Sequence, residues 1–209
     1  KAVSSNPDVS VIITNYNYEK YISRAVRSCL NQFGVNHEVI VVDDCSTDSS
    51  IETLKPFKDQ IKIVSTGTNG GVAVAANVGV KNSRGQFFIR VDADDYVNKD
   101  MCYMMKTYLE ANHDAFCVSC DYLMVDNFEN TLERRYAENE NISCGIMYRR
   151  DQLLQAGGYN NKMRHREEEE LRKRLGQEYK IHHLRIPFYR YRMHNTNKTK
   201  EPEYKTWEM

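Results

Sequence analysis

The chain has 209 residues, of which 41% are hydrophobic and 28% are charged. This composition is typical of a globular domain that buries a core large enough to fold without disulfides or metal ions. The 29 basic and 29 acidic residues give a formal net charge of zero, so the bulk charge provides no field that would attract nucleic acid or anionic lipid.

Strands and helices alternate through the first half of the sequence. Short runs rich in β-branched residues predict four strands, at residues 9–14, 38–43, 61–65 and 86–91. Helical spacing of apolar residues predicts three helices between them, at residues 18–32, 46–57 and 72–81, the last opened by the Gly-rich turn 67–71. This alternation predicts an α/β fold with a mostly parallel central sheet and helices on both of its faces.

Polar side chains follow three of the predicted strands. Residues 14–17 follow the first strand, Asp43 and Asp44 end the second, and residues 92–95 follow the fourth. Asp and Asn are common in turns, but that preference does not account for acidic groups at successive strand ends. Because ligands bind beyond the carboxyl ends of parallel strands, we expect a ligand site at this edge.

The second half of the sequence is less regular. Helices are predicted at residues 99–112 and 151–156 and around Glu168, and strands are predicted at residues 115–123, 141–148, 179–184 and 187–194. A polar tail follows from Asn195.

The cysteines and the lengths of the apolar runs indicate the cellular location of the protein. Of six cysteines, only Cys117 and Cys120 form a C-x-x-C pair, and they lie in an alternating strand whose positions three apart face opposite sides. No second pair completes a zinc site, so we expect free thiols and a cytoplasmic location. No apolar run is long enough to span a bilayer. Since the chain begins with Lys1, we expect it to be a domain of a longer protein, whose other parts could carry a membrane anchor and place it at the cytoplasmic face of a membrane.

The sequence Asp92-Ala93-Asp94 is the strongest candidate for a metal site. Two carboxylates two residues apart at the end of an apolar strand suit a hard cation such as Mg²⁺ or Mn²⁺. Such a cation can hold a diphosphate and neutralise its charge as it leaves. Asp95 is adjacent and could share this role.

Seven short motifs extend over nearly the whole chain: Val11-Ile-Ile-Thr-Asn-Tyr-Asn17, Val41-Val-Asp-Asp-Cys-Ser-Thr-Asp48, Asn69-Gly-Gly-Val with Ala76-Asn77-Val-Gly79, Val91-Asp-Ala-Asp-Asp95, Gly157-Gly-Tyr, Glu167-Glu168 and Tyr191-Arg-Met-His194. In content and order they resemble glycosyltransferase family 2, a group of inverting enzymes with the GT-A fold. The resemblance implies a single Rossmann-like domain that moves a sugar from a nucleotide diphosphate sugar, with UDP the first expectation, to a hydroxyl of a glycan or lipid-linked acceptor. Residues 1–97 would be the donor-binding half, 98–194 the acceptor and catalytic half, and 195–209 a tail.

The resemblance also implies roles for individual residues. Donor-binding roles fall on Thr14, Tyr16, Asp44, Asn77, Asp92, Arg192 and His194, and metal-binding roles on Asp92 and Asp94. The late pair, Arg192 and His194, would lie near the diphosphate. Guanidinium groups suit phosphate oxygens, and imidazole can donate to them or bind the metal.

The predicted catalytic base is Glu168. An inverting transfer needs a carboxylate that takes the proton of the acceptor hydroxyl, and the family places it in an acidic pair before a helix. With about 100° per residue, Glu168 lies on the same helix face as Leu171 and Leu175, whereas Glu169 and Glu170 point away. The competing interpretation is a solvated helix whose glutamates pair with basic residues four positions later.

Two departures from the family pattern leave alternatives open. Ala76 stands where the family often has Arg, so a phosphate or base contact is missing or supplied elsewhere, and Asn160 replaces a common Asp. The rival functions are a nucleotidyltransferase and a non-catalytic nucleotide- or glycan-binding module. A nucleotidyltransferase of this fold class is expected to have a Gly-rich loop with Arg or Lys directly after its first strand. Residues 14–17 occupy that position and carry neither a glycine nor a basic residue, which argues against this function.

Overall fold

Four parallel strands form the first half of a nine-stranded sheet in the computed structural model, which describes residues 6–140, 142–195 and 197. Their order is β3 (Lys62–Ser65), β2 (His37–Asp43), β1 (Val9–Asn15) and β4 (Phe87–Asp92). Each of the four was predicted from its apolar run. The pairing places Asn15 beside Asp43 and Thr14 beside Asp92, so the polar strand ends do share one edge.

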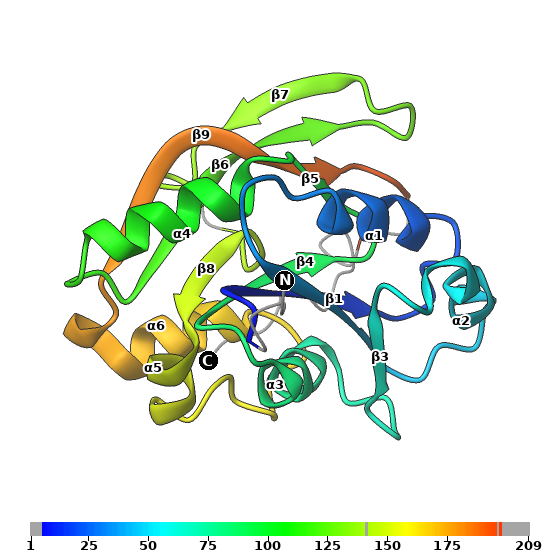
Figure 1. The fold of residues 1–209 in the computed structure, drawn as a ribbon, viewed down its shortest axis with the longest axis horizontal. Coiled ribbons are helices and arrows are strands. Elements are labelled where there is room, and N and C mark those ends of the chain that lie inside the picture. The colour runs from blue at the N-terminus through cyan, green and yellow to red at the C-terminus, as the bar shows by residue number, and fades with distance from the viewer. Residues whose placement is uncertain (1–5, 141, 196, 198–209) are drawn as a thin grey trace, which may run out of the picture.

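The second half of the sheet continues from β4 through β8 (Ile146–Arg149), β6 (Cys117–Val125), β9 (Ile181–Arg192) and β5 (Tyr96–Val97). The strand β8 is antiparallel to both of its neighbours, whereas β6 and β9 are parallel to each other. The short strand β7 (Thr131–Arg135) pairs with β6 as a side branch. As Figure 1 shows, β9 curves over this end of the molecule, beneath β7.

Helices cover both faces of the sheet (Figure 1). One face carries α1 (Ile22–Leu30), α2 (Ser50–Thr53) with the short 3₁₀ turn Lys55–Phe57, and α4 (Met101–Ala111). The other face carries α3 (Val72–Asn82), α5 (Arg150–Gln155) and α6 (Glu167–Leu175), which is followed by the 3₁₀ turn Gly176–Glu178. The predicted α/β architecture is therefore confirmed.

Two hydrophobic clusters, one on each face, form the core. Along β1, Val11 and Ile13 belong to one cluster and Ile12 to the other, as the alternation of a strand requires. Cys117 and Cys120 divide between the clusters in the same way, and all six cysteines are free thiols, as predicted.

Several boundaries differ from the prediction. The first helix begins at Ile22 instead of residue 18, because residues 18–21 form a turn. The two strands predicted at 179–184 and 187–194 are one continuous strand, β9, whose register against β6 shifts near Pro187. The tail from residue 195 lies, apart from Asn195 and Asn197, outside the described residues.

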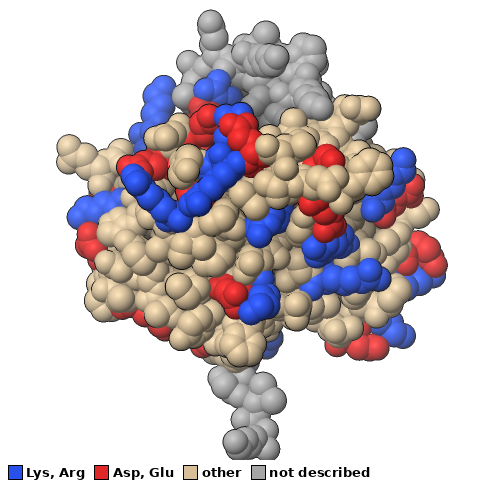
Figure 2. Space-filling view, turned by 90° about the horizontal axis from the view of Figure 1, so that it is seen from above, with Lys and Arg blue, Asp and Glu red and all other residues tan. Residues whose placement is uncertain are grey.

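Two surface properties complete the description. Within the described residues, none of the helices combines the length and the apolar character that crossing a membrane would require. On the face shown in Figure 2, basic and acidic side chains are interspersed over the described surface, in keeping with the formal net charge of zero.

Candidate active site

A cavity of about 600 Å³ lies at the carboxyl ends of the parallel strands. Six of the predicted site residues line it: Thr14, Tyr16, Asp44, Asp92, Asp94 and Glu168. They come from the ends of β1, β2 and β4 and from the first turn of α6. Three others, Asn77, Arg192 and His194, are not among its lining residues.

Asp44 holds the Gly-rich turn at one side of the cavity. Its carboxylate accepts hydrogen bonds from the backbone N–H groups of Gly70 (2.9 Å) and Gly71 (2.7 Å) and from the Thr66 hydroxyl (2.8 Å). Gly71 has a φ of 85°, which favours glycine, and α3 begins at the next residue. Asp44 therefore fixes the shape of the turn from which α3 starts, and it lines the cavity while only 4% exposed.

The three aspartates after β4 have different surroundings. The Asp92 carboxylate accepts a hydrogen bond from the Thr14 hydroxyl (3.1 Å), and 31% of its side chain remains exposed. The Asp94 carboxylate contacts His194 Nε2 at 2.9 Å. Asp95 is buried and accepts from the Tyr189 hydroxyl (2.7 Å) and the Arg192 backbone N–H (2.8 Å). Of the three, Asp92 has the carboxylate that is most accessible to a ligand.

Burial and charge repulsion act together on Asp95. Desolvation, followed by the neighbouring charges of Asp94 and Asp92, raises the pKa of Asp95 well above its usual value. Carboxylates that repel one another in this way are stabilised by a nearby cation. The acidic strand end therefore has the electrostatic character of a cation site.

The grouping of possible metal ligands differs from the predicted pair. Ligand atoms of Asp92, Asp95 and Cys144 lie within 4.8 Å of one another, and Asp94 is not in this group. Two of the three possible ligands are carboxylates, and their oxygens fit Mg²⁺ or Mn²⁺.

Arg192 supports the acidic loop instead of lining the cavity. It is 4% exposed, and its guanidinium donates to the Asp94 carbonyl (Nε, 3.0 Å), the Asn127 carbonyl (Nη1, 3.3 Å) and Glu129 Oε1 (Nη2, 3.3 Å). All three of its nitrogens thus bond to the protein. The predicted contact between Arg192 and a diphosphate has no support in this geometry.

His194 and Asn77 also serve neighbouring protein groups. The His194 ring stacks on Tyr21, with 4.8 Å between the ring centroids, and its Nε2 contacts Asp94. The Asn77 amide donates to the Tyr159 carbonyl and to Asn161 Oδ1, both at 2.7 Å, and accepts from the Tyr159 N–H at 3.0 Å. Asn77 therefore fastens the loop after α5 to α3, and its predicted place in the donor site is likewise unsupported.

Glu168 lies in the first turn of α6 and lines the cavity while only 2% exposed, with its side chain turned inward as the helix geometry predicted. Its Oε1 accepts a hydrogen bond from the Tyr179 hydroxyl and lies 3.5 Å from Arg172 Nε. Its Oε2 has no hydrogen-bond partner in the described part of the chain. Burial raises the pKa of Glu168, and the nearby hydroxyls of Tyr148 and Tyr179 partly oppose this. A buried carboxylate with one unpaired oxygen beside a cavity has the properties of a general base.

The adjacent glutamates are committed to arginines. Glu167 pairs with Arg90 at 2.7 Å, Glu169 pairs with Arg166, and Glu170 pairs with Arg174 at 3.0 Å. The solvated-helix interpretation would pair Glu169 with Lys173, four positions later, but in the structure Glu169 pairs with Arg166. Glu168 remains the glutamate of this run that best fits a catalytic role.

Two cavity arginines were not singled out from the sequence. Arg90 is a charged residue among the apolar residues of strand β4. Because a buried charge requires partners of opposite charge, this position could have indicated that Arg90 contacts acidic residues of the site. Arg164 is exposed, lines the cavity and packs its stem against Gly71. Among the described residues no carboxylate pairs with Arg164. Nothing in the sequence around Arg164 predicted that it would line the cavity.

The fold is of the GT-A class. The profile described as "Glycosyl transferase family 2" matches residues 10–196, and the chain belongs to that family. This confirms the resemblance drawn from the seven motifs.

Relatives and solved structures agree with the family. The chain is 36% identical over 121 residues to an uncharacterised glycosyltransferase of Haemophilus influenzae, covering 53% of this chain and 48% of that protein. It is 36% identical over 109 residues to poly(ribitol-phosphate) β-N-acetylglucosaminyltransferase TarS of Staphylococcus aureus, covering 50% of this chain and 19% of TarS. The chain thus spans about half or less of these relatives.

The structural comparisons show the same fold. The crystal structure of S. aureus TarS 1–349 in complex with UDP-GlcNAc aligns with a TM-score of 0.77 and 23% identity, over 97% of this chain and 62% of that one. A mannosyltransferase from Pyrobaculum calidifontis, in complex with GDP-Man and Mn²⁺, aligns with a TM-score of 0.72 and 20% identity, over 90% of this chain and 57% of that one.

Proposed function

We propose that the protein is an inverting, metal-dependent glycosyltransferase that moves a sugar from a UDP-sugar to a hydroxyl of a glycan or lipid-linked acceptor. The observation that carries the proposal is the pairing, in one cavity, of the accessible Asp92 carboxylate with the buried Glu168 carboxylate, whose Oε2 is unpartnered in the described residues. An inverting transfer needs these two functions on opposite sides of the sugar. The TarS complexes with UDP and UDP-GlcNAc support UDP as the first nucleotide to test, and the GDP-Man complex supports GDP as the second.

The donor end of the cavity is assigned to residues near the acidic strand end. Asp92, with Asp95 beside it, would hold Mg²⁺ or Mn²⁺, which when bound neutralises the diphosphate leaving group. Thr14 orients Asp92 through its hydrogen bond. Tyr16 and Asp44 line the cavity toward the Gly-rich turn and would contact the nucleoside. Arg164, unpaired among the described residues, is assigned to a phosphate in place of Arg192.

The proton transfer is assigned to Glu168. As the acceptor oxygen attacks the anomeric carbon, its proton passes to Oε2, while Tyr179 holds Oε1. A base whose pKa is raised by burial is better matched to a hydroxyl proton near neutral pH than an ordinary carboxylate. The attack comes from the face opposite the diphosphate, so the anomeric configuration inverts.

The organisation and location of the protein follow the same proposal. Residues 1–97 supply the donor side apart from Arg164, and residues 98–194 supply the acceptor side. Free cysteines agree with a cytoplasmic protein, and a membrane-face location would depend on other parts of a longer chain. Nucleic acid is not a proposed partner.

Ligand-dependent thermal stability tests the proposal. A ligand at 100 times its Kd stabilises the folded state by about 2.7 kcal/mol, which for a chain of this size raises Tm by roughly 5–10 °C. UDP and UDP-sugars are expected to give such a shift with Mn²⁺ and a small one without it. Preference for a free nucleoside triphosphate would instead support a nucleotidyltransferase, and no response to any nucleotide would support a non-catalytic module.

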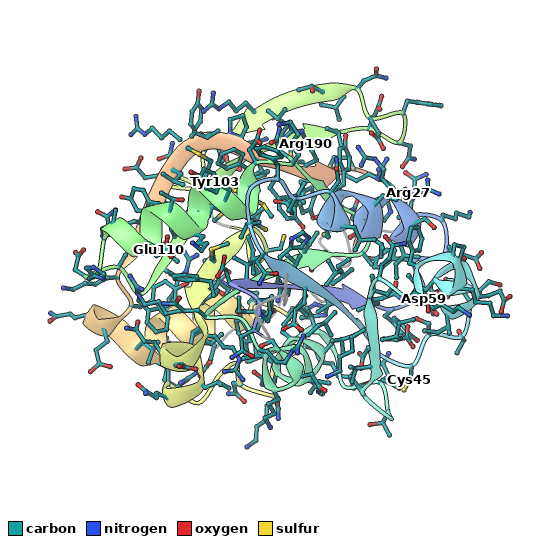
Figure 3. The ribbon with its side chains drawn as sticks, viewed as in Figure 1. Arg27, Cys45, Asp59, Tyr103, Glu110 and Arg190 are labelled. Carbon is teal, nitrogen blue, oxygen red and sulfur yellow. The ribbon has the colours of Figure 1, made fainter. Side chains whose placement is uncertain are left out.

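A matched pair of variants makes the test specific. Asp92→Asn should abolish the Mn²⁺-dependent shift. Asp59→Asn makes the same chemical change on the exposed surface near α2 (Figure 3) and should leave the shift intact. An equal response in both variants would remove Asp92 from the donor site.

A further inference from the structure

Arg90 places a charge in the middle of a buried strand. It lies in β4 between Ile89 and Val91, both fully buried, and is itself 2% exposed. An unpaired charge in such surroundings would be strongly destabilising. The contacts of its guanidinium therefore indicate what the charge is for.

The guanidinium bridges two parts of the cavity wall. Its Nη1 donates to Glu167 Oε1 at 2.7 Å, and Glu167 is also 2% exposed. Its Nε lies 3.4 Å from Asp92 Oδ1 and has no hydrogen-bond partner in the described residues. An arginine side chain is always charged in a protein, so these contacts are those of a buried cation.

These two contacts link the diphosphate end of the cavity to the helix turn that carries the proposed base. The proposed reaction requires a fixed distance between these two parts of the site. Asp92 is the accessible carboxylate at the diphosphate end, and Glu167 is the residue directly before Glu168. The turn into α6 is otherwise set by Arg166, whose φ of 58° is unusual for a residue with a side chain. The ion pair from β4 therefore anchors the first turn of α6 against the strand that carries Asp92.

Resting on the proposed transferase function, we propose that Arg90 is a positioning residue. By contacting Asp92 and Glu167 together, it sets the position of the Glu168 carboxylate relative to the diphosphate end of the cavity. Within the described residues, the contacts of its guanidinium are with Asp92 and Glu167 and not with Glu168 itself. A displacement of about 1 Å of a catalytic group can cost about 100-fold in rate, so the loss of this bridge should appear in kcat.

The alternative is an ion pair that only stabilises the fold. Replacing a buried ion pair with apolar residues of similar volume is often neutral for stability. The double variant Arg90→Met/Glu167→Met therefore separates the two explanations, because it removes the bridge while keeping the space filled. Arg149→Met provides the structural control: Arg149 donates to the Leu109 and Asn112 carbonyls at the end of α4, pairs with β4 in the sheet, and does not line the cavity.

The experiment measures kcat, donor KM and the Tm shift caused by UDP with Mn²⁺ for the wild type, the double variant and Arg149→Met. Activity is measured as transfer of the sugar from the donor to an acceptor identified by screening. If screening identifies no acceptor, transfer of the sugar to water is measured instead. The double variant is expected to keep the wild-type Tm shift and donor KM while kcat falls about 30- to 100-fold. Arg149→Met is expected to lose stability and keep kcat.

Each result has one meaning. A double variant with kcat within twofold of the wild type overturns the inference, and so does a double variant that loses the UDP response, because the defect would then be in donor binding. If the double variant does not fold, Arg90→Lys decides, since a Lys ammonium lacks the planar fork by which the guanidinium faces Glu167 with Nη1 and Asp92 with Nε; an unchanged kcat there would also refute the inference. A wild type with neither UDP response nor transfer would refute the proposed function itself.

Discussion

The substitution Glu168→Gln removes the proposed base with little change in shape. Gln keeps a side-chain oxygen that can accept from the Tyr179 hydroxyl, but its amide cannot take a proton from an acceptor hydroxyl. General-base catalysis contributes about 10²–10⁴-fold to rates. We therefore expect kcat to fall by about that factor, equivalent to about 3–5 kcal/mol in the barrier, while donor KM and the UDP-dependent Tm shift stay near wild type.

The stability of this variant should move in the opposite direction to its activity. Because burial raises the pKa of Glu168 in the folded state, its contribution to stability is present below the unfolded pKa and is lost as pH rises through the folded pKa. Gln has no such pH dependence. The Tm of Glu168→Gln relative to wild type should therefore increase from acidic to neutral pH, which a pH series of thermal melts would measure.

The assay compares kcat from UDP release under saturating donor, with Glu178→Gln as the control. Glu178 is exposed in the 3₁₀ turn after α6 and does not line the cavity, so its variant should behave as wild type. A Glu168→Gln variant with kcat within threefold of wild type would refute the assignment. Loss of the UDP-dependent shift in the same variant would place Glu168 in donor binding instead.

Three further outcomes are expected. Tyr179→Phe removes a hydrogen bond that lowers the pKa of Glu168, so the acidic limb of the kcat/KM–pH profile should move to higher pH; an unmoved limb would contradict the proton-transfer role. Asp44→Ala leaves the Gly70 and Gly71 N–H groups without their acceptor and should cost about 2–4 kcal/mol in urea unfolding, whereas a loss below 1 kcal/mol would show that the turn holds without it. Arg164→Gln should raise donor KM about tenfold at similar kcat, and equal KM values in Arg164→Gln and in the surface control Arg27→Gln on α1 (Figure 3) would exclude a phosphate contact.

The parallel half of the fold could be predicted because its signals are local. The four strands carry apolar β-branched runs, and their polar ends are adjacent in sequence, so the shared edge followed from topology alone. The strand β7 gives no such signal: four of its five residues are exposed, and it is defined by pairing with β6. The two residues of β5 are likewise a strand only because β9 lies beside them.

The site was predictable where the side chain's direction followed from its own element. The inward direction of Glu168 followed from helix periodicity, and the place of Asp92 at the shared edge of the sheet followed from its position at the end of β4. The position of Arg192 outside the cavity lining could not be predicted because its partners come from elsewhere: Glu129 and Asn127 lie 63 and 65 residues away, in the turn between β6 and β7. The same holds for the contacts of Asn77, whose partners are in the loop at residues 159–161.

The most direct test is a crystal structure of the protein with Mn²⁺ and UDP, with the ion located by its anomalous scattering. The account predicts one manganese ion bound by Asp92 and by the diphosphate, with the uridine toward the Gly-rich turn that Asp44 holds and the Glu168 carboxylate across the cavity. A manganese ion or a nucleotide bound elsewhere, with Asp92 contacting neither, would contradict it.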